Sequence, residues 1–198
     1  MILESMVCNW MQTNCYIFGD EKTKEVVIID AGGEPLAIIR RIENKDLKPI
    51  ALINTHGHPD HTGGTEKLRD HFNIPIMYHP DEHKLIGFQK VKYIQEPDVI
   101  EIGSEKLHVL DSPGHSPGGI LLASYENKII FTGDTLFAGS IGRTDFEGGD
   151  YTKLMNSIRV KIMRNKNITD DFQVLAGHMH ESTVGRERTM NMFKRDFL

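Results

Sequence analysis

The feature that most constrains this chain is the segment THGHPDH at residues 55–61, which places three histidines and one aspartate within six positions. It follows the apolar run at residues 50–53, so a buried strand is expected to end there and a loop to begin. Imidazole and carboxylate groups are ligands for zinc, iron or manganese. The alternative is a solvated loop with surface histidines, so ligands elsewhere in the chain must decide between the two.

The order of residues in this segment suits two metal ions rather than one. On an extended backbone His56 and His58 project to the same side, and Pro59 favours an extended His58 before the chain turns. The turn then directs Asp60 and His61 toward a second point in space. One short loop therefore offers ligands to two neighbouring sites.

Three further candidate ligands each follow an apolar run. His115 lies in the proline- and glycine-rich segment SPGHSPGG, Asp134 follows residues 129–133, and His178 follows residues 172–177. Taken singly, each is as well explained as a loop or capping residue. If the preceding strands share a direction, however, all of these side chains gather at one edge of the core, where functional loops concentrate.

The rest of the sequence predicts clusters of strands with helices interspersed. Strands are expected at residues 2–8, 13–19, 25–29, 50–53, 76–78, 99–102, 106–110, 119–124, 128–131 and 172–176. Helices are expected at residues 34–42, 64–71, 80–86, 150–163 and 183–193. Residues 87–96 show no clear pattern. This order favours two mixed sheets packed together with helices outside, in one domain spanning residues 1–198.

Composition limits the partners. The net charge of −5, without a basic stripe, argues against nucleic-acid binding. No apolar run approaches membrane-span length and the N-terminus lacks a basic leader, so no membrane partner is expected and a cytoplasmic protein is predicted. Cys8 and Cys15 are expected to be small buried side chains rather than a disulfide, which suits a reducing compartment.

The segments THGHPDH, SPGHSPGG, FTGDTLF and AGHMHEST, in this order and spacing, resemble the metallo-β-lactamase superfamily. The segment GSIGRTDF at residues 139–146 is similar to the small, single-domain relatives of glyoxalase II, the hydroxyacylglutathione hydrolases. The resemblance covers nearly the whole chain. It implies an α+β fold, an αβ/βα four-layer sandwich of two mixed β-sheets flanked by helices, with metal ions at one edge of the sheets.

The resemblance also implies a role for each candidate ligand. Seven side chains match the family's ligands: for the first metal His56, His58 and His115, for the second Asp60, His61 and His178, and as the bridge between them Asp134. Two divalent cations are therefore expected, with zinc first and iron or manganese as alternatives. In the family a water or hydroxide forms the other bridge, and Asp60 would orient it.

The function that the resemblance implies is hydrolysis of a small-molecule thioester, such as an S-2-hydroxyacylglutathione or a related thiol conjugate. A hydroxide between the metals would attack the carbonyl, and the thiolate leaves with little help from a proton donor. Glyoxalase II carries a C-terminal helical domain that binds glutathione, and no such domain is expected here.

Two residues are candidate substrate contacts. Arg143 stands where glyoxalase II has a lysine that contacts the glutathione carboxylate, so it either holds a substrate carboxylate or pairs with Asp145. His180 follows the last ligand by two positions and either lines the substrate pocket or faces solvent.

Several alternatives stay open. A persulfide dioxygenase resembles glyoxalase II and holds one Fe(II) through residues that match His56, His115 and Asp134. A lactonase shares the ligand set, and a metal-stabilised binding protein would use it without catalysis. A β-lactamase is disfavoured because zinc β-lactamases commonly use a cysteine ligand, and neither cysteine lies near the motifs. The sequence predicts no oligomeric state.

Overall fold

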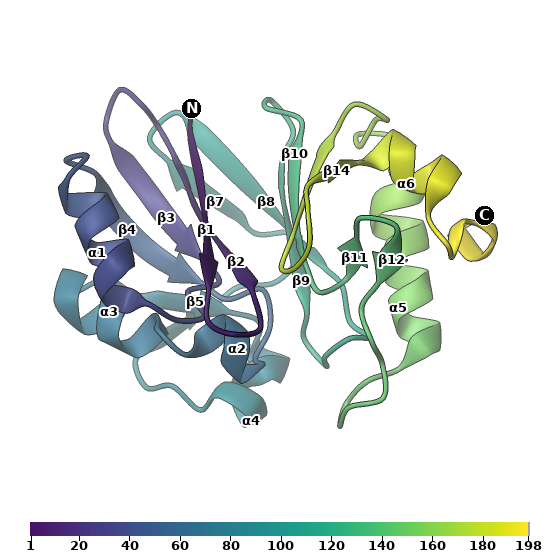
Figure 1. Ribbon diagram of the computed structural model, residues 1–198, viewed down its shortest axis with the longest axis horizontal. Helices are drawn as coiled ribbons and strands as arrows, with labels where there is room; N and C mark the ends of the chain where they lie inside the picture. The colour runs from purple at the N-terminus through teal and green to yellow at the C-terminus, as the bar shows by residue number, and fades with distance from the viewer. Residues whose placement is uncertain (198) are drawn as a thin grey trace.

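The computed structural model describes residues 1–197, and most of its strands form two six-stranded sheets that face each other (Figure 1). The first sheet has the order β1 (Ile2–Cys8), β2 (Thr13–Gly19), β3 (Glu25–Ile29), β4 (Lys48–Ile53), β5 (Ile76–Tyr78) and β6 (Val91–Tyr93). The second has the order β14 (Ser182–Thr183), β13 (Gln173–Ala176), β10 (Ile129–Gly133), β9 (Ile120–Ser124), β8 (Glu105–Asp111) and β7 (Val99–Ile102). Both sheets are mixed, because β3 to β6 run parallel and β10 runs parallel to β13.

Helices cover the outer face of each sheet, as Figure 1 shows on its left and right sides. On the first sheet lie α1 (Pro35–Glu43) and α3 (Thr65–Phe72); on the second lie α5 (Tyr151–Ser157), its π-helical continuation Ile158–Met163, and α6 (Val184–Met190). Short elements complete the chain: α2 (Pro59–Thr62), α4 (His83–Ile86), 3-10 turns at Pro80–Glu82 and Lys194–Phe197, and the pair β11 (Leu136–Phe137) and β12 (Ser140–Ile141). The predicted sandwich of two mixed sheets flanked by helices is confirmed.

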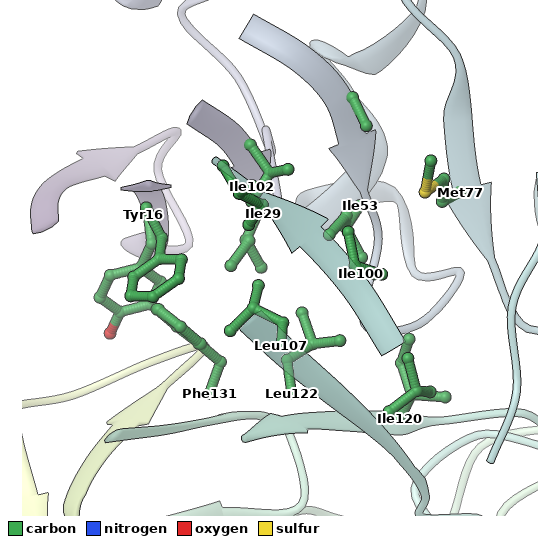
Figure 2. Packing of buried hydrophobic residues seen from close by; sticks show 14 of the residues in the cluster. Tyr16, Ile29, Ile53, Met77, Ile100, Ile102, Leu107, Ile120, Leu122 and Phe131 are labelled. Atoms are coloured by element: carbon green, nitrogen blue, oxygen red, sulfur yellow. The ribbon is translucent and has the colours of Figure 1, made fainter. Parts of the chain in front are cut away.

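The inner strands are apolar on both faces because each face is covered. Val27 and Ile29 of β3 join the cluster between the sheets, whereas Val26 and Ile28 pack on the helix side. In β9, Leu122 faces the central cluster, whereas Leu121 and Ala123 on either side of it pack in the cluster with α5. Figure 2 shows the central cluster, with side chains from both sheets meeting. Such strands have near-continuous apolar sequences, which is why they were predictable.

Some elements differ from the sequence-based expectation. Strand β6 lies within residues 87–96, for which no structure was predicted, and β11, β12 and β14 are two-residue strands. Helix α6 ends at Met190 rather than at residue 193, because Asn191 takes an extended backbone conformation. Both cysteines are buried and free, as predicted. Among the described residues, no helix has the length and apolar character needed to cross a membrane.

Candidate metal centre

The candidate ligands follow strands that end at the same edge of the sandwich. Strands β8, β10 and β13 share one direction, because β9 is antiparallel to both β8 and β10 while β13 is parallel to β10. The loop after β4 comes from the other sheet and carries residues 55–61. The structure thus brings together, from four separate loops, all seven predicted ligands.

The first group of ligands consists of three histidines. Ligand atoms of His56, His58 and His115 all lie within 4.8 Å of one another, with His58 Nδ1 at 2.9 Å from His115 Nε2. His58 is extended (φ −67°, ψ 145°) immediately before Pro59, which begins α2. Three imidazole nitrogens that face one point supply three of the four ligands of a tetrahedral site, or half of an octahedral set.

The second group contains Asp60, His61 and His178. The Nε2 atom of His178 lies 3.2 Å from Asp60 Oδ2 and 3.3 Å from His61 Nε2, and Asp60 Oδ2 lies 3.6 Å from His61 Nε2. Asp60 and His61 lie in α2, a single helical turn that begins directly after the extended His58. One loop therefore serves both groups.

Asp134 lies between the two groups. Its Oδ2 atom is 3.5 Å from Nε2 of both His115 and His178, and its Oδ1 atom is 3.3 Å from His61 Nε2. The residue follows Gly133, which has φ +46°, a left-handed conformation that glycine adopts most readily. A carboxylate at this place can bridge two cations.

Two buried atoms in the centre test whether a metal fits. Among the described residues, His56 Nε2 and Asp134 Oδ1 are buried and have no hydrogen-bond partner. Leaving such atoms unpaired is unfavourable, and a cation would satisfy both. Gly177 also leaves room beside them, because a Cβ atom there would come within 2.4 Å of Asp134 Oδ1. Five imidazoles and two carboxylates fit a pair of divalent cations.

Hydrogen bonds behind the ligands set their orientation. Asp30 accepts from the Thr55 backbone N–H at 2.7 Å and from the Thr55 hydroxyl at 2.6 Å, and its Oδ2 lies 2.9 Å from His61 Nδ1. His115 Nδ1 donates to the Arg143 carbonyl at 2.8 Å. Both contacts leave Nε2 directed at the centre, the usual role of a second layer around a metal.

A buried carboxylate joins two ligand loops. Glu82 is fully buried and accepts from the backbone N–H of Gly57 at 2.7 Å and from that of Gly118 at 2.6 Å. Gly57 lies between the first two histidine ligands, and Gly118 lies three residues after His115. Neither Glu82 nor Asp30 was predicted from the sequence. Asp30 follows an apolar strand just as Asp134 does, so the same signal could have found it; Glu82 has no such local signal.

The surrounding charges prepare the ligands for a cation. Burial, and then the neighbouring His115, lower the pKa of His58 to about 4, and burial lowers the pKa of His56 well below its usual value. Burial opposes ionisation of Asp134, but the charge of His61 and its neighbours outweighs it and lowers the Asp134 pKa. The neutral imidazoles of the first group and the ionised Asp134 are in the states that a divalent cation requires. In the second group, despite burial, Asp134 and Asp30 raise the pKa of His61, and Asp60 and Asp134 raise the pKa of His178, so a cation bound there would displace a proton.

A cavity of about 790 Å³ opens above the ligands, and Arg143 lines it. The Arg143 guanidinium donates to both carboxylate oxygens of Asp145 at 2.6 Å, so the pairing considered from sequence is present. His180 does not line this cavity. It lies in a neighbouring hollow of about 740 Å³, together with Gln12 and Asn14.

Comparison with known proteins gives the same family as the sequence motifs. The family model described as the metallo-beta-lactamase superfamily matches residues 8–178. Hydroxyacylglutathione hydrolase GloC of Haemophilus influenzae is 36% identical over 211 aligned positions, which cover 98% of each chain.

Two solved structures share the fold over almost their whole length. BLEG-1, described as a B3 metallo-beta-lactamase, has a TM-score of 0.87 and 32% identity, covering 98% of this chain and 99% of its own. TTHA1623, solved in a di-iron-bound form, has a TM-score of 0.85 and 28% identity, covering 96% and 99%. The resemblance seen in the motifs is confirmed, and the chain belongs to the metallo-beta-lactamase superfamily of metal-dependent hydrolases.

Proposed function

We propose that the protein hydrolyses small-molecule thioesters with two divalent cations, zinc first among them. The observation that carries this proposal is the pair of His/Asp groups with Asp134 between them, in which buried His56 Nε2 and Asp134 Oδ1 have no hydrogen-bond partner, beneath an open cavity. The name of the GloC relative, a hydroxyacylglutathione hydrolase, supports a thioester as the substrate. A cytoplasmic location belongs to the same proposal.

The chemistry follows from the ligand set. When bound, two divalent cations supply Lewis acidity and lower the pKa of a water to about 7. The protein holds the ligands in place through Asp30 and the Arg143 carbonyl. Asp60 would orient that water. In the net reaction, a water oxygen adds to the thioester carbonyl carbon and the C–S bond breaks. The sulfur leaves as a thiolate that takes up a proton, so the products are a carboxylic acid and a thiol.

Elemental analysis of the purified protein, paired with hydrolysis assays, tests the proposal. We expect two metal ions per chain and thioester hydrolysis that a chelator removes and added zinc restores. A β-lactam and a lactone serve as comparison substrates. One iron per chain with oxygen consumption on glutathione persulfide, or two metals with no thioester hydrolysis, would refute the proposal.

A further inference from the structure

The mouth of the metal cavity is ringed by exposed apolar side chains. Met11, Leu85, Phe146 and Met179 line the cavity and are between 41% and 56% exposed. They come from four different segments: the turn after β1, helix α4, the loop after β12 and the loop after β13. Apolar side chains that converge from separate segments on one opening are typical of a ligand site rather than of random surface exposure.

The inner wall is also apolar and reaches the ligands. The Phe146 ring lies edge-on to the His58 ring with centroids 5.5 Å apart, and the Phe137 ring lies edge-on to that of His178 at 6.1 Å. One aromatic ring therefore flanks a ligand of each group. Ile141 adds a further buried apolar wall. A substrate group that lies next to the reacting carbonyl meets hydrocarbon on two sides.

The charges that remain in the cavity do not favour an anionic substrate. Apart from the metal ligands, the charged side chains of its lining are Arg143 and Glu147. Both oxygens of Asp145 accept from the Arg143 guanidinium at 2.6 Å, and the same guanidinium lies 3.8 Å from the centroid of the Phe146 ring. The fork that would hold a substrate carboxylate is thus occupied, and its charge is balanced.

We propose that this cavity selects thioesters with an uncharged, apolar acyl group on a thiol carrier without carboxylates, in preference to glutathione conjugates. The inference rests on the proposed thioester hydrolysis. Glutathione brings two carboxylates, and each would have to displace Asp145 or lie against apolar wall without a cation. Moving a charged group from water to such a wall is unfavourable, whereas an alkyl or arylalkyl chain gains from the transfer.

A two-by-two set of substrates separates the effect of the acyl group on kcat/KM from the effect of the thiol carrier. Lactoyl and hexanoyl thioesters, each of glutathione and of N-acetylcysteamine, are compared with the zinc-loaded protein. We expect kcat/KM to be about tenfold higher for hexanoyl-N-acetylcysteamine than for lactoylglutathione. It should rise about two- to fourfold per methylene in a series of acyl chains until the cavity is full. A preference for lactoylglutathione, or a flat series, would overturn the proposal.

The Asp145→Asn variant tests the charge argument directly. It removes the carboxylate that balances Arg143, so kcat/KM for the glutathione carrier should rise about tenfold relative to N-acetylcysteamine. The matched control is Asp171→Asn, which removes a similarly exposed carboxylate that pairs with Lys128 and does not line the cavity. The carrier ratio should stay constant in the control, and a constant ratio in Asp145→Asn would contradict the charge argument.

Binding of non-hydrolysable thioethers distinguishes failure of this inference from failure of the proposed function. Calorimetry with S-alkyl-N-acetylcysteamines on the zinc-loaded protein should show tighter binding with each added methylene, and Phe146→Ser should reduce that gain. If no thioester is hydrolysed but this series holds, the reaction is wrong and the apolar cavity site stands. If thioesters are hydrolysed but the series is flat, the site is wrong and the reaction stands.

Discussion

Single residues that are not candidate ligands themselves hold the ligand loops in position. The carboxylate of Glu82 is buried and accepts two backbone hydrogen bonds, and no positively charged group contacts it among residues 1–197. A buried carboxylate of this kind is tolerated only because its oxygens are satisfied by the loops that it joins. We infer that its role is to fix the spacing between the loop of His56 and the loop of His115.

Glu82→Gln replaces one acceptor oxygen by an N–H donor that faces a backbone N–H. We expect the variant to lose about 1–3 kcal/mol of unfolding free energy and to release metal more readily. Urea unfolding and competition with a coloured chelator measure the two effects. The control is Glu126→Gln, an exposed carboxylate in the turn between β9 and β10, which should change neither. Normal metal retention in Glu82→Gln would show that the contact has no positioning role.

Asp30 acts on one ligand of the second group. In Asp30→Asn, a single amide oxygen must replace two carboxylate oxygens, of which Oδ1 accepts from the Thr55 backbone N–H and Oδ2 from the Thr55 hydroxyl and the His61 ring N–H. Because the ring would lose its fixed orientation, we expect metal affinity at that group to fall about 10- to 100-fold. Titration with Co(II), followed by its visible spectrum, should show one site filled normally and one weakened. Two unchanged sites would contradict this role.

The lowered pKa of His58 predicts how the stability of the metal-free protein depends on pH. Burial, and then His115, lower its pKa from 6.5 to about 4 in the folded chain. Between these values the unfolded chain binds more protons, so the contribution to stability is complete above about pH 6.5 and is lost as the pH falls toward 4. His58→Gln should remove about 1–2 kcal/mol of this dependence, given the solvent screening of a partly exposed ring. Urea unfolding of chelated protein across this pH range checks the sign.

At the scale of elements, each ligand depends on where its strand ends. Gly177 follows β13 and lies against the centre, where a Cβ atom would come within 2.4 Å of Asp134 Oδ1 and 2.5 Å of His61 Cε1. Gly177→Ala should therefore displace the Asp134 carboxylate and abolish binding of at least one metal, as measured by elemental analysis. The control is Gly139→Ala, which has φ +79° but open space around it. It should lose about 1 kcal/mol through backbone strain and keep both metals.

The inner strands were predictable because their two covered faces demand apolar residues at successive positions, as Val26 to Ile29 of β3 show. The ligands were predictable because they follow such strands. The three-residue strand β6 was not predicted, since it gains its hydrogen bonds from β5 and its residues are mostly exposed. Asn9, which donates to the Asp60 carbonyl at 2.9 Å, was not predicted either, because its partner is 51 positions away.

At the scale of the whole molecule, the centre joins the two sheets. Four of the seven candidate ligands follow β4 of the first sheet, and three follow strands of the second sheet. The two sheets pack against each other through the central cluster shown in Figure 2. Cations held by ligands from both sheets would oppose separation of the two sheets. With metal about 1,000-fold above its Kd, we expect stabilisation of about 4 kcal/mol, or a rise in Tm of roughly 10 °C. Calorimetry with and without a chelator measures this; equal Tm values would contradict it.

The four apolar side chains at the mouth of the cavity and the candidate ligands lie on different kinds of structural element. The side chains at positions 11, 85, 146 and 179 stand in turns and loops and in the short helix α4, whereas the ligands are anchored to buried strand ends. A library that randomises only these four positions would leave all seven candidate ligands unchanged. Variants selected from such a library could then direct the proposed hydrolysis to new thioesters, while the strands that carry the ligands stay the same.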